Sequence, residues 1–194
     1  ANGYGYSSNP GNLTVYNGKL YFTANNPTYG TELWVTDGTT TPTVIDINPG
    51  VNTSSPSYLR VYKGELWFKA NNGTNGGDLM SYDGTTLTPR DLVAGAGAPT
   101  ISVNMVVAGN LLWYSGNSAQ TGNELFSSDG TAANSGVFED LSPGSASTTI
   151  TALTAVGGVI MYNTYDATMG SQPRFVVVSA VNTVSFNSNG GTSG

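Results

Sequence analysis

Apolar and polar residues alternate along short stretches of the chain, and turns rich in glycine, proline and asparagine separate these stretches. Within the first 50 positions the alternation predicts β-strands at residues 12–16, 20–24, 31–36 and 43–47. Asn17-Gly18 is typical of a two-residue hairpin turn in which both residues take positive φ. Asp37-Gly38-Thr39 predicts the turn after the third strand. No helical periodicity is sustained, so the pattern predicts an all-β fold of four-stranded antiparallel sheets.

The four-strand pattern recurs with a period of 46 residues. Eleven positions reappear without a gap in the next two copies, among them Glu32, Asp37 and Gly38; Asp78, Asp83 and Gly84; and Glu124, Asp129 and Gly130. A fourth copy starts at Leu153 and departs from the pattern at Gln172-Pro173-Arg174. A fixed period of this length is typical of propellers and stacked arrays, whose terminal repeats are atypical. We expect a single repeat domain, residues 1–194, with units at 12–57, 58–103, 104–151 and 152–187 and a tail at 188–194.

The predicted strands are apolar on both faces. In the second strand Leu20 and Phe22 point one way and Tyr21 points the other way. The position of Tyr21 carries Trp67, Trp113 and Met161 in the later copies. Because each sheet needs cover on both faces, we expect neighbouring repeats to pack face to face. Four-stranded sheets packed in this way around an axis are the blades of a β-propeller, so we expect a β-propeller-like fold, with a linear β-stack as the alternative.

Two of the repeats contain a related eight-residue motif. The two segments are Glu32-Leu33-Trp34-Val35-Thr36-Asp37-Gly38-Thr39 and Glu124-Leu125-Phe126-Ser127-Ser128-Asp129-Gly130-Thr131. They resemble the Glu-Leu-Trp-x-Ser-Asp-Gly-Thr repeats of large secreted bacterial surface proteins, which are usually described as β-propellers. The second copy, residues 78–85, matches less closely, and the fourth lacks the motif. The resemblance covers residues 12–145 of this chain, implies a propeller-type fold and a surface location, and brings no catalytic residues with it.

The composition excludes several classes of function. The chain has no Cys and no His, which removes disulfides, thiolate chemistry, Cys/His zinc sites and triads that need an imidazole. Only 9% of the residues are charged and the net charge is -6, so we expect no nucleic acid partner. No stretch approaches the ~20 apolar residues of a membrane-spanning helix. A surface of Thr, Ser, Asn and Gly favours secretion or an extracellular surface, in which case Ala1 is the mature start.

Carboxylates are the remaining candidates for catalysis or metal binding. Nine of the twelve recur in sets, which are Glu32, Asp78 and Glu124; Asp37, Asp83 and Asp129; and Asp46, Asp91 and Asp140. Residues that return in every repeat are expected to do the same local job, and Asp before Gly stabilises a turn. Each Asp-Gly-Thr turn has one carboxylate, fewer than a calcium loop needs. We therefore predict no catalytic residue, no metal and no cofactor, and the least favoured alternative is a glycosidase that uses Glu65 or Asp166.

Carbohydrate binding suits the composition better, because aromatic rings stack on sugars and neutral side chains hydrogen-bond to hydroxyls. Trp34, Trp67 and Trp113 fall within strand patterns, so we expect them to be buried between sheets. The exposed candidates are Tyr4 and Tyr6 near the N-terminus, Tyr29 in a loop, and Tyr165, and of these we predict Tyr29 and Tyr165 to bind glycans. Sugar could instead be attached covalently, since three asparagines head Asn-x-Thr/Ser sequons, namely Asn12, Asn52 and Asn72.

The C-terminal segment is the candidate for assembly. It is strongly β-prone and departs from the repeat pattern, with Phe175, Val176, Val177, Val178, Val181, Val184 and Phe186. Such a segment either completes its own last sheet or pairs with the open edge of another molecule. We expect a non-enzymatic structural subunit of a bacterial extracellular assembly, such as a fibril or a surface layer, which its C-terminal strand and N-terminal segment join to further copies of itself. The alternative is a carbohydrate-binding adhesin or lectin.

Overall fold

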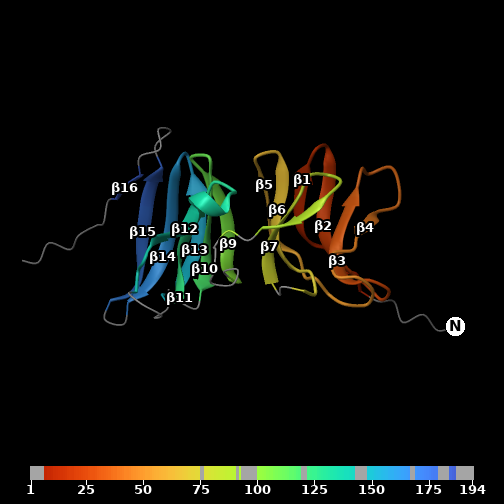
Figure 1. The fold of residues 1–194 in the computed structure, drawn as a ribbon, viewed down its shortest axis with the longest axis horizontal. Helices are drawn as coiled ribbons and strands as arrows, with labels where there is room; N and C mark the ends of the chain where they lie inside the picture. The colour runs from red at the N-terminus through yellow and green to blue at the C-terminus, as the bar shows by residue number, and fades with distance from the viewer. Residues whose placement is uncertain are drawn as a thin grey trace, which may run out of the picture. The chain divides into compact units, whose positions relative to one another are not determined.

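The computed structural model describes residues 7–74, 77–90, 92, 100–118, 122–142, 148–166, 169–178 and 184–186. These residues form four antiparallel sheets of four strands each, and in every sheet the strands lie in chain order (Figure 1). For a few strand residues, including Asp78, Asp166 and residues 184–186, the description covers the backbone alone. The all-β prediction and the prediction of four-stranded antiparallel units are confirmed.

The strand boundaries follow the repeat. The first sheet contains β1 (Gly11–Tyr16), β2 (Lys19–Asn26), β3 (Gly30–Thr36) and β4 (Thr43–Ile45). The second contains β5 (Ser57–Tyr62), β6 (Glu65–Asn71), β7 (Gly77–Tyr82) and β8 (Leu87–Pro89). The third contains β9 (Thr100–Ala108), β10 (Leu111–Ser118), β11 (Gly122–Ser128) and β12 (Ser135–Glu139), with the 3-10 turn η1 (Ala132–Asn134) before β12. The fourth contains β13 (Ile150–Val156), β14 (Val159–Asp166), β15 (Gly170–Val178) and β16 (Val184–Phe186). Of the strands predicted for the first repeat, the last ends at Ile45 instead of Ile47.

Contacts group the sheets into two compact units, residues 1–90 and residues 91–194. Unit 1 holds the first and second sheets, and unit 2 holds the third and fourth. The repeat pattern predicts a single domain, whereas the contacts pair the repeats two by two.

The turn between the first two strands is the same in all four sheets. Both of its residues take positive φ, with 47° and 70° at Asn17-Gly18, 48° and 77° at Lys63-Gly64, 56° and 61° at Gly109-Asn110, and 56° and 81° at Gly157-Gly158. Positive φ at both central residues is type I′ geometry, whose twist matches that of the flanking strands. The predicted Asn17-Gly18 turn is confirmed, and the same turn persists in the divergent fourth repeat.

Lys63 is the one residue of these four turns that is neither Asn nor Gly. A lysine at φ 48° is in the left-handed region, which Asn tolerates better. We expect Lys63→Asn to raise the free energy of unfolding by about 0.5–1 kcal/mol, measured by urea denaturation. Lys19→Asn, at an exposed position of β2, is the control and should not stabilise the protein. A destabilised Lys63→Asn variant would show that the Lys63 ammonium, 5.7 Å from the centroid of the Tyr62 ring, contributes more than the strain costs.

A β-bulge in the first strand of a sheet also recurs. Asn12, Tyr58 and Ala152 take φ of 50°, 59° and 54°. Each lies where the pairing between the first and second strands shifts register. The three residues occupy equivalent positions but share no chemistry, so the sequence gives no signal for this feature. The first, second and fourth repeats therefore share this backbone irregularity as well as their strand order.

In unit 1 the two sheets pack face to face. The first sheet contributes Tyr21 and Leu33, and the second contributes Leu66, Phe68 and Met80, all of which are buried. Register places Tyr21 beside Val35, and places Phe68 beside Met80, so each group lies on one face of its sheet. The interface also includes Tyr16, whose hydroxyl donates hydrogen bonds to the carbonyls of Gly64 (2.7 Å) and Asp83 (3.0 Å).

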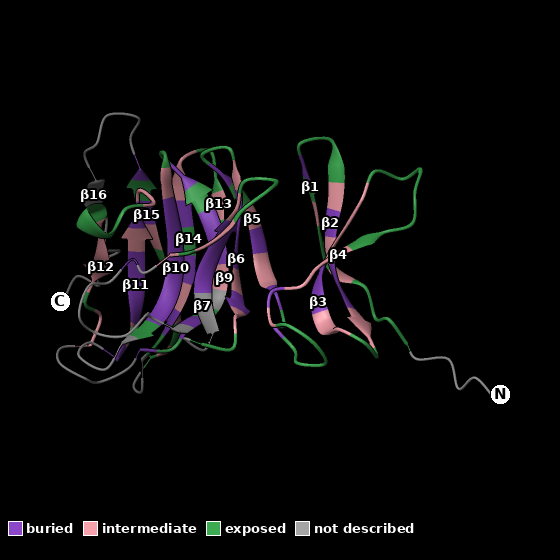
Figure 2. Cartoon of the chain, turned by 45° about the vertical axis from the view of Figure 1, so that its right-hand side comes forward, coloured by how far each residue is buried: buried purple, intermediate pink, exposed green. Residues whose placement is uncertain are grey.

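Unit 2 repeats this packing with equivalent residues. The third sheet contributes Trp113 and Leu125, and the fourth contributes Ile160, Tyr162 and Val176. Figure 2 shows β10 and β11 of the third sheet as largely buried. We call the face of a sheet that carries the position of Tyr21, Trp67, Trp113 or Met161 its trailing face. We call the opposite face, which carries Leu20 and Phe22 or their equivalents Leu66 and Phe68, Leu112 and Tyr114, or Ile160 and Tyr162, its leading face. In both units the trailing face of the earlier sheet packs on the leading face of the next.

The tryptophans follow this arrangement. Trp67 and Trp113, on trailing faces, are 2% and 0% exposed, as predicted. The indole Nε1–H of Trp113 donates to the carbonyl of Ala108 at 3.1 Å, and its ring meets Phe138 edge-on with centroids 4.7 Å apart. Trp34 lies on a leading face and is half-buried, so the prediction of burial holds for it only in part.

The C-terminal segment completes its own sheet. β15 pairs with β14 along its length, and Val176–Val178 also pair with β16. Pro173 lies inside β15, where a proline is tolerated only if its nitrogen faces away from the neighbouring strand. The Val178 N–H donates to the Gly158 carbonyl at 2.7 Å, so the N–H groups of the even-numbered residues of β15 face β14. Alternation then turns the nitrogen of Pro173 away from β14, to a side where β16 does not extend, so its missing N–H costs no ladder hydrogen bond.

Candidate functional site

The trailing face of the fourth sheet is the most exposed apolar surface on the strands of unit 2. Val156, Met161, Tyr165 and Val177 are 72%, 49%, 62% and 37% exposed, and Phe175 is half-buried beside Met161. Their register places them on one face, which on β14 and β15 carries no charged side chain among the residues whose side chains the structure describes. At the equivalent position to Met161, Trp113 is 0% exposed. Contiguous exposed apolar groups of this kind mark interaction surfaces.

The leading face of the first sheet is a second candidate. Leu20, Phe22 and Trp34 are half-buried there, and Val15, which pairs with Leu20, is 69% exposed. The equivalent residues of the second sheet, Leu66, Phe68 and Met80, are 0%, 0% and 3% exposed. The first sheet therefore presents, with partial cover, the same kind of face that the second sheet buries.

The two tyrosines predicted to bind glycans lie in different units. Tyr29 is half-buried, because its ring meets Trp34 edge-on with centroids 6.2 Å apart. The expectation that Tyr29 is an exposed loop residue is therefore wrong in this respect. Tyr165 is exposed as expected, but it lies on strand β14, among the apolar side chains of the trailing face.

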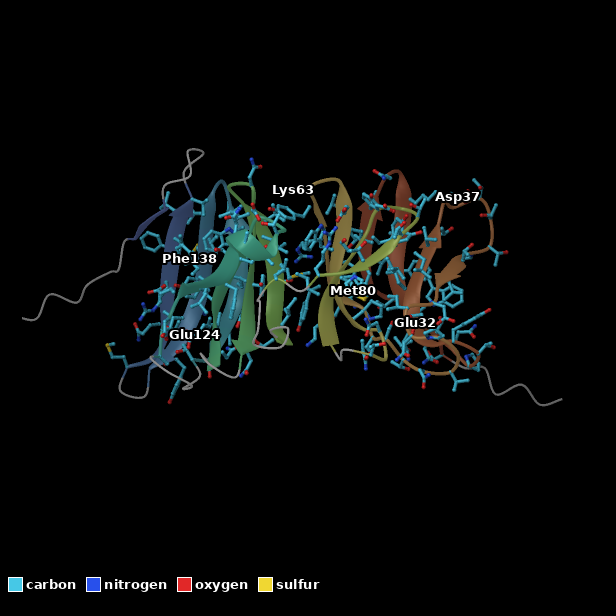
Figure 3. All side chains as sticks on the ribbon, viewed as in Figure 1. Glu32, Asp37, Lys63, Met80, Glu124 and Phe138 are labelled. Atoms are coloured by element: carbon cyan, nitrogen blue, oxygen red, sulfur yellow. The ribbon has the colours of Figure 1, made fainter. Side chains whose placement is uncertain are left out.

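Glu32 lies at the start of β3 and is fully buried, at the opposite end of that strand from Asp37 (Figure 3). Its carboxylate accepts hydrogen bonds from the Ile47 N–H (2.9 Å), the Ser54 N–H (2.9 Å) and the Ser54 hydroxyl (2.5 Å). These donors lie in the connection between β4 and β5. Glu32 therefore fixes the segment that leads from the first sheet to the second.

Glu124 does the same work in unit 2, where it is also fully buried. It accepts the Leu141 N–H at 2.7 Å, and Leu141 is the equivalent of Ile47. The Thr148 N–H donates to the Asn123 carbonyl at 3.1 Å, just as the Ser54 N–H donates to the Thr31 carbonyl at 3.1 Å. The prediction that this recurring carboxylate has a structural role agrees with the hydrogen bonds that Glu32 and Glu124 accept from these connections. In the fourth repeat Gln172 stands at this position.

The recurring aspartates form turns. Asp37 Oδ1 accepts hydrogen bonds from the N–H groups of Thr39 (2.9 Å) and Thr40 (3.1 Å), and Asp83 Oδ1 accepts those of Thr85 and Thr86, both at 2.7 Å. In the third repeat Asp129 accepts the Thr131 N–H at 2.9 Å. These backbone donors hold the pKa of the Asp37 and Asp83 carboxyls below the ordinary range. One oxygen of each carboxylate, Oδ1, accepts the hydrogen bonds of the turn, as expected for a local structural role.

The buried glutamates give the protein a pH dependence of stability. Burial raises the pKa of Glu32 and Glu124 above the ordinary value of 4.5, so the stability linked to their protonation is fully present below 4.5 and is lost as the pH rises through their folded pKa. The lowered pKa of Asp37 and Asp83 acts only as the pH falls below 3.8. We expect Tm to rise as the pH is lowered from 7 towards 4.5 and to fall again as the pH drops below 3.8.

The control for this pH dependence is Glu32→Gln, which cannot titrate. Its Tm should change less between pH 7 and about 5 than that of the wild type, in differential scanning calorimetry. An equal change in both proteins would mean that Glu32 does not titrate in this range.

The remaining glutamates form ion pairs. Glu65 Oε2 lies 2.6 Å from Arg90 Nη2, and the Arg90 guanidinium stacks over the Trp67 ring at 4.9 Å. Glu139 Oε1 lies 3.4 Å from Arg174 Nη1, and its Oε2 accepts the Tyr162 hydroxyl at 2.7 Å. Glu65 thus has a structural partner, and the side chain of Asp166, the other acid considered for a glycosidase, lies outside the described residues.

All six lysines and arginines lie on strands or directly beside them. Lys19, Arg60, Lys69 and Arg174 belong to strands, Lys63 lies in the β5–β6 turn, and Arg90 follows β8. Burial lowers the pKa of Arg60 and Lys69. Arg90 is the one cation in the connections between repeats, where it pairs with Glu65 and its N–H donates to the Leu79 carbonyl at 2.8 Å.

The side chains of the three sequon asparagines form hydrogen bonds within the chain. Asn12 donates its amide to Thr23 Oγ1 (3.3 Å) and to the Pro56 carbonyl (3.2 Å), and Asn52 donates to the Pro49 carbonyl (3.0 Å). Asn72 accepts the Thr74 N–H at 2.9 Å. A glycan replaces one of the two amide hydrogens of asparagine, so on Asn12 it would remove one of the two hydrogen bonds that the amide donates.

Two general features bear on the site. Within the described residues no group of three or more acidic side chains is placed to hold a metal ion. None of the helical segments in the described part of the chain has the length and apolar content needed to cross a membrane.

The residues predicted for assembly divide between core and surface. Val176 and Val178 are 1% and 8% exposed in the core of unit 2, whereas Phe175 and Val177 point to the trailing face. Val184 and Phe186 are described by their backbone in β16, and Val181 lies outside the described residues. Sequence reasoning missed Val156 and Met161 as surface candidates, and the signal was the one trailing-face position where an aromatic residue gives way to methionine.

No protein-family model matches the chain, and no curated protein matches it either.

Proposed function

We propose that the protein is a non-enzymatic structural subunit of a bacterial extracellular assembly, such as a fibril or a surface layer, in which its own copies are the partners. Its repeats are propeller-like blades in this proposal. The observation that carries it is the uncharged trailing face of the fourth sheet, with Met161 49% exposed at a position that Trp113 buries completely. A sheet that is built like its siblings but left open on one side is suited to receive another sheet.

The polar chemistry of the chain supports the same proposal. Glu32 and Glu124 hold connections between sheets, and Asp37 and Asp83 hold turns. Glu65 is paired with Arg90. These carboxylates stabilise the repeat itself, as expected of a structural subunit whose acidic side chains are not used for catalysis.

Self-association of the purified full-length chain is the test. Sedimentation velocity over a 100-fold range of concentration, with negative-stain electron microscopy of the same samples, should show oligomers that grow with concentration, on the order of micromolar affinity or tighter. A protein that stays monomeric throughout would overturn the proposal.

Carbohydrate binding is the second candidate, favoured by the Tyr29–Trp34 pair and by the exposed Tyr165. A glycan array should then show selective retention that Tyr29→Ala or Tyr165→Ala abolishes. Equal binding to all glycans, or binding unchanged in both variants, would contradict this candidate.

A further inference from the structure

The packing inside each unit follows one rule. The trailing face of the first sheet, with Tyr21 and Leu33, meets the leading face of the second, with Leu66 and Phe68. The trailing face of the third sheet, with Trp113 and Leu125, meets the leading face of the fourth, with Ile160 and Tyr162. The rule is therefore directional, because it joins two different faces and never two of the same kind.

Inside the units this rule leaves four faces without a partner sheet, and two of them, at the two ends of the repeat series, carry exposed apolar side chains. One is the leading face of the first sheet, with Leu20, Phe22 and Trp34. The other is the trailing face of the fourth sheet, with Met161, Phe175 and Val177. On the other two faces, the trailing face of the second sheet and the leading face of the third, Trp67 and Leu112 are 2% and 0% exposed.

The two open faces match the two sides of the established interface. Leu20 and Phe22 stand where Leu66 and Phe68 stand, and Met161 stands where Tyr21 and Trp113 stand. Among the described side chains, Glu32 is the one charged group on either face. It lies on the leading face of the first sheet and is fully buried against the β4–β5 connection. An interface between the two faces would bury no unpaired charge.

We propose that a second copy of this chain docks head to tail, with the trailing face of its fourth sheet on the leading face of the first sheet. The contact continues the stacking rule of the units from one molecule to the next. Because the two faces differ, the interface is heterologous. Each added copy covers one face of its neighbour and exposes its own copy of that same face, so further copies can add. This inference rests on the proposed function and names the surfaces that carry it.

Complementary single-face variants test the geometry. Met161→Asp places a charge on the trailing face alone, and Phe22→Asp places one on the leading face alone. Each variant by itself should lose self-association by about 100-fold or more. Mixed in equal amounts, they should form a one-to-one dimer, because each still offers the face that the other lacks. Sedimentation velocity of the single variants and of the mixture measures this.

Further variants keep the test decisive. Circular dichroism must show the wild-type strand signal, and Val177→Asp and Val15→Asp serve as second choices on the two faces if either first variant does not fold. Met161→Leu, which keeps the face apolar, should assemble like the wild type. A dimer formed by one aspartate variant alone would indicate pairing of like faces and overturn the head-to-tail geometry.

The failures are distinguishable. A wild-type protein that never associates contradicts the proposed function itself. A wild-type protein that associates while both aspartate variants associate equally well retains the proposed function and overturns only this choice of surfaces.

Discussion

Glu32→Ala is expected to lower the free energy of unfolding of unit 1 by about 2–4 kcal/mol, because three donors then lose a buried acceptor. These donors are the Ile47 N–H, the Ser54 N–H and the Ser54 hydroxyl. The chain has two compact units, so hydrogen exchange measured by mass spectrometry should accompany chemical denaturation. Exchange should accelerate in the peptides that contain Ile47 and Ser54.

Two controls separate the buried contact from charge in general. Glu65→Ala removes a carboxylate whose side chain is 28% exposed in its pair with Arg90, and should cost less than about 1 kcal/mol. Glu32→Gln keeps one acceptor oxygen and should fall between the wild type and Glu32→Ala. A Glu32→Ala protein as stable as Glu65→Ala would show that water replaces the carboxylate at no cost.

Trp113→Ala is expected to lower the free energy of unfolding of unit 2 by about 3–5 kcal/mol. The indole is fully buried, packs on Phe138 and donates to the Ala108 carbonyl, so its removal leaves both a cavity and an unpaired acceptor. Circular dichroism in a urea titration measures the loss without relying on tryptophan emission.

Met161→Ala is the matched control for this substitution, since Met161 occupies the equivalent position in the fourth repeat and is 49% exposed. At a concentration where the protein is monomeric it should cost about 1 kcal/mol or less. Comparable losses in the two variants would mean that the trailing face of the fourth sheet is covered within the monomer.

The strand order and the hairpins could be predicted from the sequence, because both depend on local signals. The Asn17-Gly18 turn needs positive φ at both residues, and both residues have it. The 46-residue period places the same turn at Lys63-Gly64, even though lysine is uncommon in such a turn. The recurring acids could be assigned to structure for the same reason, since a contact made in every repeat leaves the same residue in every repeat.

Features that depend on packing between sheets could not be predicted. The pattern marks both faces of every strand as apolar, and so it gives Tyr21, Trp113 and Met161 one environment, whereas the last repeat leaves Met161 open. The bulges at Tyr58 and Ala152 have no common residue type. The partners of Glu32 lie in a connection without regular structure, where no periodicity indicates which N–H groups will turn inward.

The placement of the cations has a consequence for proteolysis. Trypsin cleaves after Lys and Arg and needs an extended, mobile segment of several residues, yet every such residue here is held on a strand, in a two-residue turn or in an ion pair. In the connections between sheets the one basic residue is Arg90, whose guanidinium pairs with Glu65 and whose N–H donates to the Leu79 carbonyl at 2.8 Å. The folded chain should therefore remain intact in trypsin until whole sheets open, a durability reached without a single disulfide.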